Sequence, residues 1–524
     1  MHTAHDTALP PISRKPPPAH DTFCPQRRRR YVLVAAILAS SLGFIDGSVV
    51  SIAIPAIRSD IGASLGEAQW ISNAYALMLS ALILAGGALG DRVGLRRSFA
   101  AGIALFIVAS LLCAAAPTPS LLIAARTVQG IGAAVMVPGS LAIIAKAYPK
   151  AERGRAIGIW AAASALTTAL GPVIGGLVLS VFDDSVWRWI FAINLPLGGV
   201  ALYLLVAKVP ADEAAPQRRI DIGGALLATV SLGGIALGLT LLSGEMRIAG
   251  FDAPTVLIGA GFALVVAFVL WEARHPEPMM ALGLFRQRTF SGANLATFFL
   301  YFALSAVLFY LPMLLIAGWG VDESAVGFVF LPLSAAIALL SGPVGKLSDR
   351  IGPRLPMAAG SALVALAFGG MALLADAGVH RFWSGVFPMM VLMGLGMSLV
   401  VSPLSIAVMT AIEDEDTGAA SGINNAVSRI AGLVAVAALG SVAAIRFAAV
   451  AGADVQLPSF GEVPGEALPA QLEMLRVQAS DSAFAAVAWF AAAGSLLAAV
   501  IAWMTAPGGM RGQAAAVDAE QPAG

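Results

Sequence analysis

The chain has 524 residues, of which 58% are hydrophobic and only 12% are charged. A soluble domain is about half apolar and about a quarter charged, so this composition excludes an ordinary soluble protein. The 31 basic and 31 acidic residues cancel, which gives no indication of a nucleic-acid partner. The two cysteines, Cys24 and Cys113, are too few for a disulfide framework or a thiolate metal site, so no metal is expected.

The first 30 residues are rich in proline and end in four consecutive arginines. The apolar run that follows is too long for the hydrophobic region of a signal peptide. We therefore expect a disordered basic tail over residues 1–30, followed by an uncleaved membrane-spanning helix.

Apolar stretches long enough to cross a membrane then repeat along the chain. A bilayer core of about 30 Å requires roughly 20 apolar residues in a helix. Fourteen stretches satisfy this requirement, which predicts an all-α polytopic membrane protein. They cover residues 31–55, 68–90, 98–117, 121–146, 155–181, 189–208, 221–242, 253–272, 290–316, 325–345, 355–376, 385–411, 418–446 and 482–506.

The basic residues predict the orientation of these spans. If the N-terminus is cytoplasmic, 23 of the 31 Lys and Arg residues fall in cytoplasmic segments, six fall outside, and Arg126 and Arg429 lie within spans. Such an excess of inside positive charge is typical of membrane proteins. We expect both termini to be cytoplasmic, with a disordered tail over residues 507–524.

A sequence repeat divides the chain into two halves. The segment from Gly87 to Arg96 recurs from Gly345 to Arg354, 258 positions later. The same offset aligns the first six spans (31–208) with the last six (290–506), and residues 209–289 then hold two additional helices. Two parallel six-helix bundles are typical of transporters that alternate access around a central site.

The repeated loops carry acidic residues that orientation alone does not explain. Arginines in these loops fit the positive-inside rule, but carboxylates contribute little to orientation. Asp91 could cap the N-terminus of a helix in the opposite half and so latch one conformation. The predicted latch comprises Gly87, Asp91, Arg92, Gly94, Arg96, Arg97, Asp349 and Arg350.

Five motifs together resemble the major facilitator superfamily, specifically its fourteen-helix drug:proton antiporter branch. They are Gly87–Arg97, Leu122–Ala134, Gly171–Gly176, Phe44–Pro55 and Trp187–Gly198. The Gly-Pro motif starting at Gly171 is similar to one associated with exporters. The resemblance implies multidrug or antibiotic efflux. One departure is that Ser428 and Arg429 stand where related exporters usually carry Arg and then Gln.

Asp46 is the one carboxylate predicted well inside a span. A charge in hydrocarbon is costly and therefore indicates function, although a structural salt bridge is the alternative. At about 1.5 Å per residue, Asp46 lies roughly 15 Å and Arg126 roughly 10 Å from the outer helix ends, so the two could meet. Burial favours the protonated carboxyl and a nearby guanidinium favours the charged form, which predicts a proton-coupling pair.

The motif Gly171, Pro172, Gly175 and Gly176 has two interpretations. Small residues spaced by four allow close helix packing, and proline removes a backbone hydrogen bond and kinks a helix. We interpret these residues as a hinge between the two halves, and packing alone is the alternative.

The substrate pocket is expected between the halves near the membrane midplane. Beside Asp46, the candidate lining residues are Trp70, Asn73, Tyr75, Gln129, Asn194, Asn294, Tyr301, Phe309 and Asn425. Each aromatic residue among them could instead anchor the chain at the lipid interface. The scarcity of acidic residues favours neutral or weakly charged amphiphilic substrates.

We predict a proton-coupled antiporter that exports drugs or other small amphiphilic molecules across a bacterial cytoplasmic membrane. It would act as a monomer among membrane lipids and need no cofactor, because the proton gradient supplies the energy. The alternatives are an uptake symporter for a metabolite and a membrane sensor that does not transport. An enzyme is not expected, because the sequence carries no nucleophile–base pair.

Overall fold

The computed structural model describes residues 22–181, 184–212, 221–243, 246–248, 251–412, 417–452 and 455–508. Fourteen helical segments in these ranges are long and apolar enough to cross a membrane, which confirms the predicted number. They form six N-terminal spans, two additional spans and six C-terminal spans. Most of each predicted terminal tail, residues 1–21 and 509–524, lies outside the described residues.

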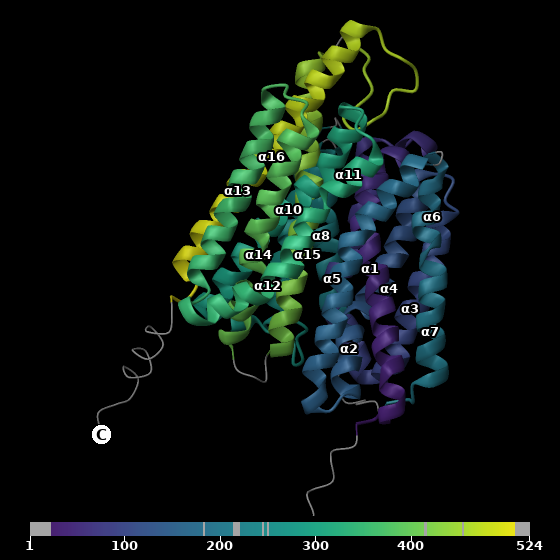
Figure 1. Cartoon of the computed structure of the whole chain (residues 1–524), viewed down its shortest axis with the longest axis vertical. Helices are drawn as coiled ribbons and strands as arrows, with labels where there is room; N and C mark the ends of the chain where they lie inside the picture. Colours follow the sequence, from purple (N-terminus) through teal and green to yellow (C-terminus); the bar gives the residue numbers. More distant parts are fainter. Residues whose placement is uncertain are drawn as a thin grey trace, which may run out of the picture.

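The N-terminal half forms one bundle of six spans (Figure 1). Its helices are α1 (Gln26–Ile61), α2 (Leu65–Val93), α3 (Leu95–Ala114), α4 (Pro119–Ala147), α5 (Lys150–Val181), α6 (Trp187–Ala192) and α7 (Asn194–Lys208). A short 3-10 turn, η1 (Asp184–Val186), precedes α6, and α6 and α7 together form the sixth span. We call the end of the molecule at which α1 begins the terminal face, and the other end the opposite face.

The C-terminal half repeats this arrangement. Its elements are α10 (Arg288–Met313) with the π-helical turn η4 (Leu314–Gly318), α11 (Glu323–Val329), α12 (Leu331–Ile351), α13 (Arg354–Asp376), the π-helical turn η5 (Phe382–Val386), α14 (Phe387–Thr410), α15 (Thr417–Ala451) and α16 (Ala470–Thr505). In Figure 1 the purple-to-blue and green-to-yellow bundles lie side by side.

The two additional spans, α8 (Ile222–Thr240) and α9 (Ala253–Glu272), pack against each other between the halves in sequence. α8 contacts both α2 and α15 and therefore touches one helix of each half. Two antiparallel strands of two residues each, β1 (Arg247–Ile248) and β2 (Phe251–Asp252), lie between α8 and α9 in the chain. The 3-10 turn η2 (Leu241–Ser243) precedes these strands, and the 3-10 turn η3 (Leu282–Arg286) follows α9.

Local sequence signals explain several helix boundaries. Ser64 and Glu67 form a reciprocal capping box at the start of α2, which satisfies two backbone donors that the helix leaves free. The repeated loops both turn on a glycine: Gly94 has φ 94° and Gly352 has φ 85°. A side chain is strained at such positive φ values, so glycine allows each helix to stop and the next to start at once.

Several helices extend further than the hydropathy predicted, and α16 does so most of all. α1 begins at Gln26 rather than at residue 31, and α16 begins at Ala470 rather than at residue 482. The polar side chains in the first part of α16 have partners there: Arg476 donates to the Ala317 carbonyl (2.6 Å) and Asp481 accepts from Trp319 Nε1 (2.7 Å). These contacts stabilise a polar helical segment that hydropathy left outside the predicted spans.

Candidate functional site

Asp46 and Arg126 form an ion pair in the interior of the N-terminal half. Arg126 Nη1 lies 2.7 Å from Asp46 Oδ1 and 2.6 Å from Oδ2. The exposed fractions are 1% for Asp46 and 2% for Arg126, so both charges are removed from solvent. The predicted contact between α1 and α4 is therefore present in the structure.

Amide and hydroxyl groups surround this pair. Gln129 Nε2 donates to Asp46 Oδ1 (3.0 Å) and to Ser110 Oγ (3.0 Å), and Gln129 Oε1 accepts from Arg126 Nη1 (2.7 Å). Asn194 Nδ2 also donates to Ser110 Oγ (3.1 Å). Two predicted pocket residues, Gln129 and Asn194, thus belong to the hydrogen-bond network of the ion pair.

The remaining faces of the Arg126 guanidinium are also occupied. Its Nε donates to the carbonyl of Ile71 (2.9 Å), and its Cζ lies 4.5 Å from the ring centroid of Tyr75 and 5.6 Å from that of Phe191. Such cation–π contacts stabilise a desolvated cation. Arg126 is therefore held by α1, α2, α4 and α6 at once, and Tyr75 forms one wall of the cluster.

The other pocket candidates are divided between the two halves of the chain. Trp70 Nε1 and Asn73 Nδ2 on α2 are buried atoms without a hydrogen-bond partner. On α10, Asn294 accepts a hydrogen bond from Asn424 of α15 (3.1 Å) within the C-terminal half. Three candidates remain in that half: Phe309 packs edge-on against Tyr310, Tyr301 is half-buried, and Asn425 accepts from Arg429 Nε (3.1 Å).

The predicted latch residues surround the two repeated turns. Gly87, Asp91 and Arg92 lie at the end of α2, Gly94 forms the turn, and Arg96 and Arg97 begin α3. Arg96 donates to the carbonyls of Leu205 (3.1 Å) and Val206 (2.6 Å) at the end of α7. In the second copy, Asp349 and Arg350 are exposed at the end of α12. A latching role for these residues stays a prediction.

Asp212 is a carboxylate at the first turn that the sequence did not single out. Its two oxygens accept from the backbone N–H groups of Leu95 (2.9 Å) and Arg96 (3.0 Å), and Lys146 Nζ lies 2.8 Å away. Although burial alone would raise the pKa of Asp212, these hydrogen bonds and the Lys146 charge hold it below its usual value. Asp212 thus caps the positive N-terminus of α3.

The predicted hinge residues lie where α5 meets its neighbours. Gly171, Pro172, Gly175 and Gly176 are all buried. A Cβ at Gly176 would lie 2.3 Å from the Glu323 carbonyl oxygen, and a Cβ at Gly327 would lie 2.5 Å from the Pro172 carbonyl oxygen. These glycines therefore allow α5 of one half to contact α11 of the other, and a hinge motion stays a prediction.

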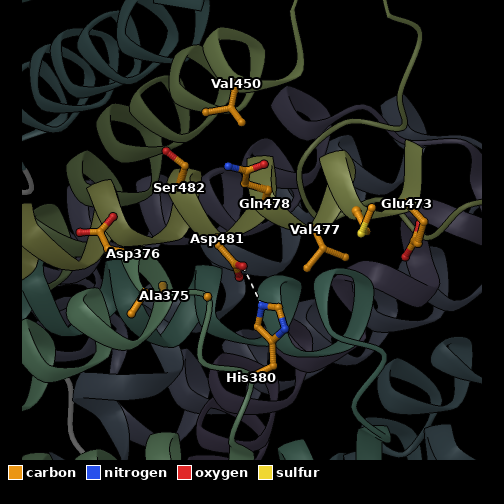
Figure 2. Close-up of a pocket in the computed structure, with 12 residues that line it drawn as sticks. Ala375, Asp376, His380, Val450, Glu473, Val477, Gln478, Asp481 and Ser482 are labelled. Atoms are coloured by element: carbon orange, nitrogen blue, oxygen red, sulfur yellow. Dashed lines mark hydrogen bonds and ion pairs between the residues drawn. The ribbon is translucent and has the colours of Figure 1, made fainter. Parts of the chain in front are cut away.

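A pocket of about 670 Å³ opens on the opposite face of the C-terminal half (Figure 2). Asp481 on α16 accepts from His380 Nε2 (2.7 Å) and from Trp319, and Asp376 accepts from Trp489 (2.8 Å). Sequence reasoning missed Asp481 because the predicted span began one residue later. Within the described ranges, no group of three or more His, Cys, Asp or Glu residues is arranged to hold a metal ion.

Comparisons with known proteins decide the family. The family model described as Major Facilitator Superfamily matches residues 36–436. The chain belongs to the major facilitator superfamily. It is therefore a multi-pass membrane transporter for a small molecule, as the sequence predicted, and not an enzyme.

Curated members of the superfamily are similar over most of their length. The chain is 34% identical to the multidrug resistance protein Stp of Mycobacterium tuberculosis over 420 residues, which cover 80% of this chain and 76% of Stp. It is 33% identical to the puromycin resistance protein pur8 of Streptomyces alboniger, with 82% and 86% covered. The tetracenomycin C resistance and export protein of Streptomyces glaucescens is 31% identical, with 79% and 76% covered.

Solved structures share the fold at low sequence identity. A bacterial homologue of the human lysosomal transporter Spinster, in an inward-facing and unoccupied conformation, has a TM-score of 0.64 at 17% identity, with 92% of this chain and 99% of that chain covered. The D-xylose–proton symporter has a TM-score of 0.62 at 14% identity, with 91% and 98% covered. These similarities establish the fold alone.

Proposed function

We propose that this transporter is a proton-coupled antiporter that exports drugs or other small amphiphilic molecules by alternating access. The similarity to resistance and export proteins supports the direction of transport, and the Gly-Pro motif on α5 is consistent with it. The proton gradient is the energy source, and no cofactor takes part. The chain acts as a monomer in the bacterial cytoplasmic membrane. Its termini are both cytoplasmic, an orientation that the distribution of its basic residues supports.

The observation that carries this proposal is the buried pair Asp46–Arg126. A carboxylate with 1% exposure in a membrane-spanning helix is stable as an anion only while its cationic partner stays in place. When the pocket opens outward, Arg126 leaves Asp46 and keeps its contacts with Gln129 and Tyr75, and Asp46 takes up a proton. When the pocket opens inward, Arg126 returns and the proton leaves toward the cytoplasm.

Two other functions are compatible with the same fold, and they differ from export in the direction or the presence of transport. An uptake symporter would move substrate and proton in the same direction, and a sensor would bind a ligand without net transport. Everted and right-side-out vesicles loaded with the same substrate separate these functions. Export predicts substrate accumulation in energised everted vesicles, which an uncoupler abolishes.

The decisive experiment replaces Asp46 by asparagine. We expect Asp46→Asn to abolish efflux driven by an imposed proton gradient in proteoliposomes, because the site then carries no exchangeable proton. Membrane insertion is retained, because the amide is isosteric with the carboxyl group. Asp60→Asn, near the C-terminal end of the same helix, is the matched control and keeps gradient-driven efflux. Wild-type efflux by Asp46→Asn would refute the assignment of the proton site.

A further inference from the structure

Arg429 lies on the seam between the two halves, inside the span formed by α15. A Cβ at Gly422 of α15 would lie 2.8 Å from Leu84 of α2, and a Cβ at Gly440 would meet Gln69 of α2. Arg429 is seven residues after the first glycine and eleven before the second. These spacings place all three residues on one face of a helix, so Arg429 is on the side of α15 that packs against α2.

Within the part of the chain that the structure describes, Arg429 contacts neutral polar groups and forms no ion pair with an acid. Its Nε donates to Asn425 Oδ1 (3.1 Å), a neutral amide. Its electrostatic neighbours are the phenol groups of Tyr75 on α2 and Tyr301 on α10. Among the ion pairs of the described residues, none includes Arg429. Both Asp46 oxygens are already bound by Arg126.

Unsatisfied polar atoms lie on the same seam. Asn73 falls between Gln69 and Leu84 on α2, is 1% exposed, and its Nδ2 has no hydrogen-bond partner. The neighbouring Trp70 Nε1 is also an unpartnered N–H donor, whereas Gln69 Oε1 is an unpartnered acceptor. Buried polar groups are normally hydrogen-bonded, so unsatisfied donors on the seam that also carries Arg429 indicate a site that a ligand completes.

We propose that Arg429 is the anion-binding residue of the transport site, and that the transported compounds carry a carboxylate, phenolate or similar acidic group on an apolar body. This inference rests on the proposed function, because it names the substrate class of the same transporter. A guanidinium binds such groups through charge-assisted hydrogen bonds, and the apolar body packs against Tyr75 and Tyr301. It replaces the sequence-based preference for neutral compounds by a preference for acidic ones.

A pair of dyes with one frame and opposite charges tests the proposal. Fluorescein is an anion, and tetramethylrhodamine methyl ester is a cation on the same xanthene frame. We expect the wild-type protein in nanodiscs to bind fluorescein more tightly by about tenfold or more, measured by fluorescence polarisation at neutral pH. Absence of fluorescein binding, or equal or tighter binding of the cation, would overturn the proposal.

Variants of α15 test whether Arg429 causes the preference for the anionic dye. Arg429→Gln should weaken fluorescein binding by about tenfold to a hundredfold and leave binding of the cationic dye unchanged or stronger. Arg446→Gln, on the same helix but exposed, is the matched control and keeps wild-type binding of both dyes. Unchanged fluorescein binding by Arg429→Gln contradicts the proposal. If that variant does not fold, the comparison of fluorescein with the O-methyl ether of its methyl ester, in which both acidic groups are blocked, on the wild-type protein decides.

Two further measurements separate this inference from its alternatives. Inorganic phosphate and chloride are tested as competitors of dye binding. If these ions displace the bound dye and the protein shows no preference between the two dyes, the site binds inorganic anions, which contradicts a substrate role. Dye efflux is also measured in proteoliposomes with and without a proton gradient. Gradient-independent transport with the anionic preference intact refutes proton coupling alone, whereas gradient-driven transport without that preference refutes only the role of Arg429.

Discussion

The Asp46 and Arg126 side chains depend on each other because neither charge has access to solvent. Removing one partner of a buried ion pair leaves an uncompensated charge and costs about 3–5 kcal/mol, whereas replacing both by apolar residues is often nearly neutral. The same dependence makes the pair suitable for proton coupling, since protonating Asp46 frees Arg126 for its other partners, Gln129 and Tyr75.

A double-mutant cycle on thermal stability measures this dependence. We expect Asp46→Leu and Arg126→Leu each to lower the unfolding temperature in detergent, because each leaves one charged group buried alone. The double variant should be more stable than the sum of the two losses predicts, by an interaction energy of about 1–3 kcal/mol. Additive losses would mean that the two side chains are stabilised by separate contacts and not by each other.

At this scale the sequence predicted the charged residues and named Gln129, Tyr75 and Asn194 as pocket candidates, but it did not single out Ser110. Asp46 and Arg126 stood out because charges in apolar spans are rare, and their contact is found in the structure. Ser110 carries no such signal, because a serine in a membrane helix ordinarily bonds its own backbone, as it also does here with Phe106 (2.8 Å). Asp212 was missed because an acid in a polar segment is unremarkable until the fold brings it to α3.

At the scale of elements, the turn between α2 and α3 depends on a glycine within the turn and on a carboxylate from a distant segment of the chain. Gly94 allows α3 to start immediately, and Asp212, just after α7, accepts from the first N–H groups of α3. Arg96 in return donates to the last carbonyls of α7. The start of α3 and the end of α7 thus compensate each other's free backbone groups.

The lowered pKa of Asp212 predicts a specific pH dependence of stability. Because its folded pKa lies below the ordinary 3.8, its contribution is present above about pH 4 and is lost as the pH falls through the folded value. Wild type should therefore melt at a higher temperature than Asp212→Asn by a constant margin from neutral pH down to about pH 5. That margin should shrink below about pH 4.

Thermal melts of the detergent-solubilised protein across this pH range test the prediction. Glu466→Gln, which changes an exposed carboxyl in the segment between α15 and α16, controls for the loss of one negative charge. A margin that is already lost at neutral pH, or that grows on acidification, would show that Asp212 is not stabilised as an anion by the α3 terminus.

Element positions were predictable where apolar runs are long, and less so where polar residues continue a helix. All fourteen spans follow from hydropathy because a helix is the structure that satisfies its own backbone in lipid. The start of α16 did not follow, because Arg476 and Asp481 are favourable in a helix only once η4 supplies free carbonyls and the residue after it, Trp319, supplies an N–H group. Hydropathy alone contains no information about such contacts.

At the scale of the whole molecule, the two halves are joined at the opposite face. Arg58 at the end of α1 is 3% exposed and donates to the Phe460 carbonyl (2.6 Å) and Ser459 Oγ (2.6 Å) of the segment between α15 and α16. The close contact of α5 with α11 lies at the same end. The repeat predicted two halves, but it could not predict this closure, because the segment around Ser459 has no counterpart in the repeated motif.

Alternating access requires these contacts to break, which a reversible crosslink tests. In the double variant Arg58→Cys/Ser459→Cys, a short thiol-specific crosslinker joins the halves at the opposite face, and we expect transport in proteoliposomes to fall to the level of empty vesicles. The native cysteines, Cys24 and Cys113, are buried and react more slowly. Reduction of the crosslink should restore the rate.

The matched control joins two helices of the same half. Arg446 Nη2 of α15 lies 3.1 Å from Ser482 Oγ of α16, so Arg446→Cys/Ser482→Cys reacts with the same reagent without connecting the halves. Transport by this crosslinked control should match that of the untreated protein, because rocking moves the C-terminal half as a unit. If the Arg58→Cys/Ser459→Cys pair is crosslinked and transport continues at the full rate, the opposite face does not open during the cycle. The two halves would then have to expose their shared site by a motion other than rocking.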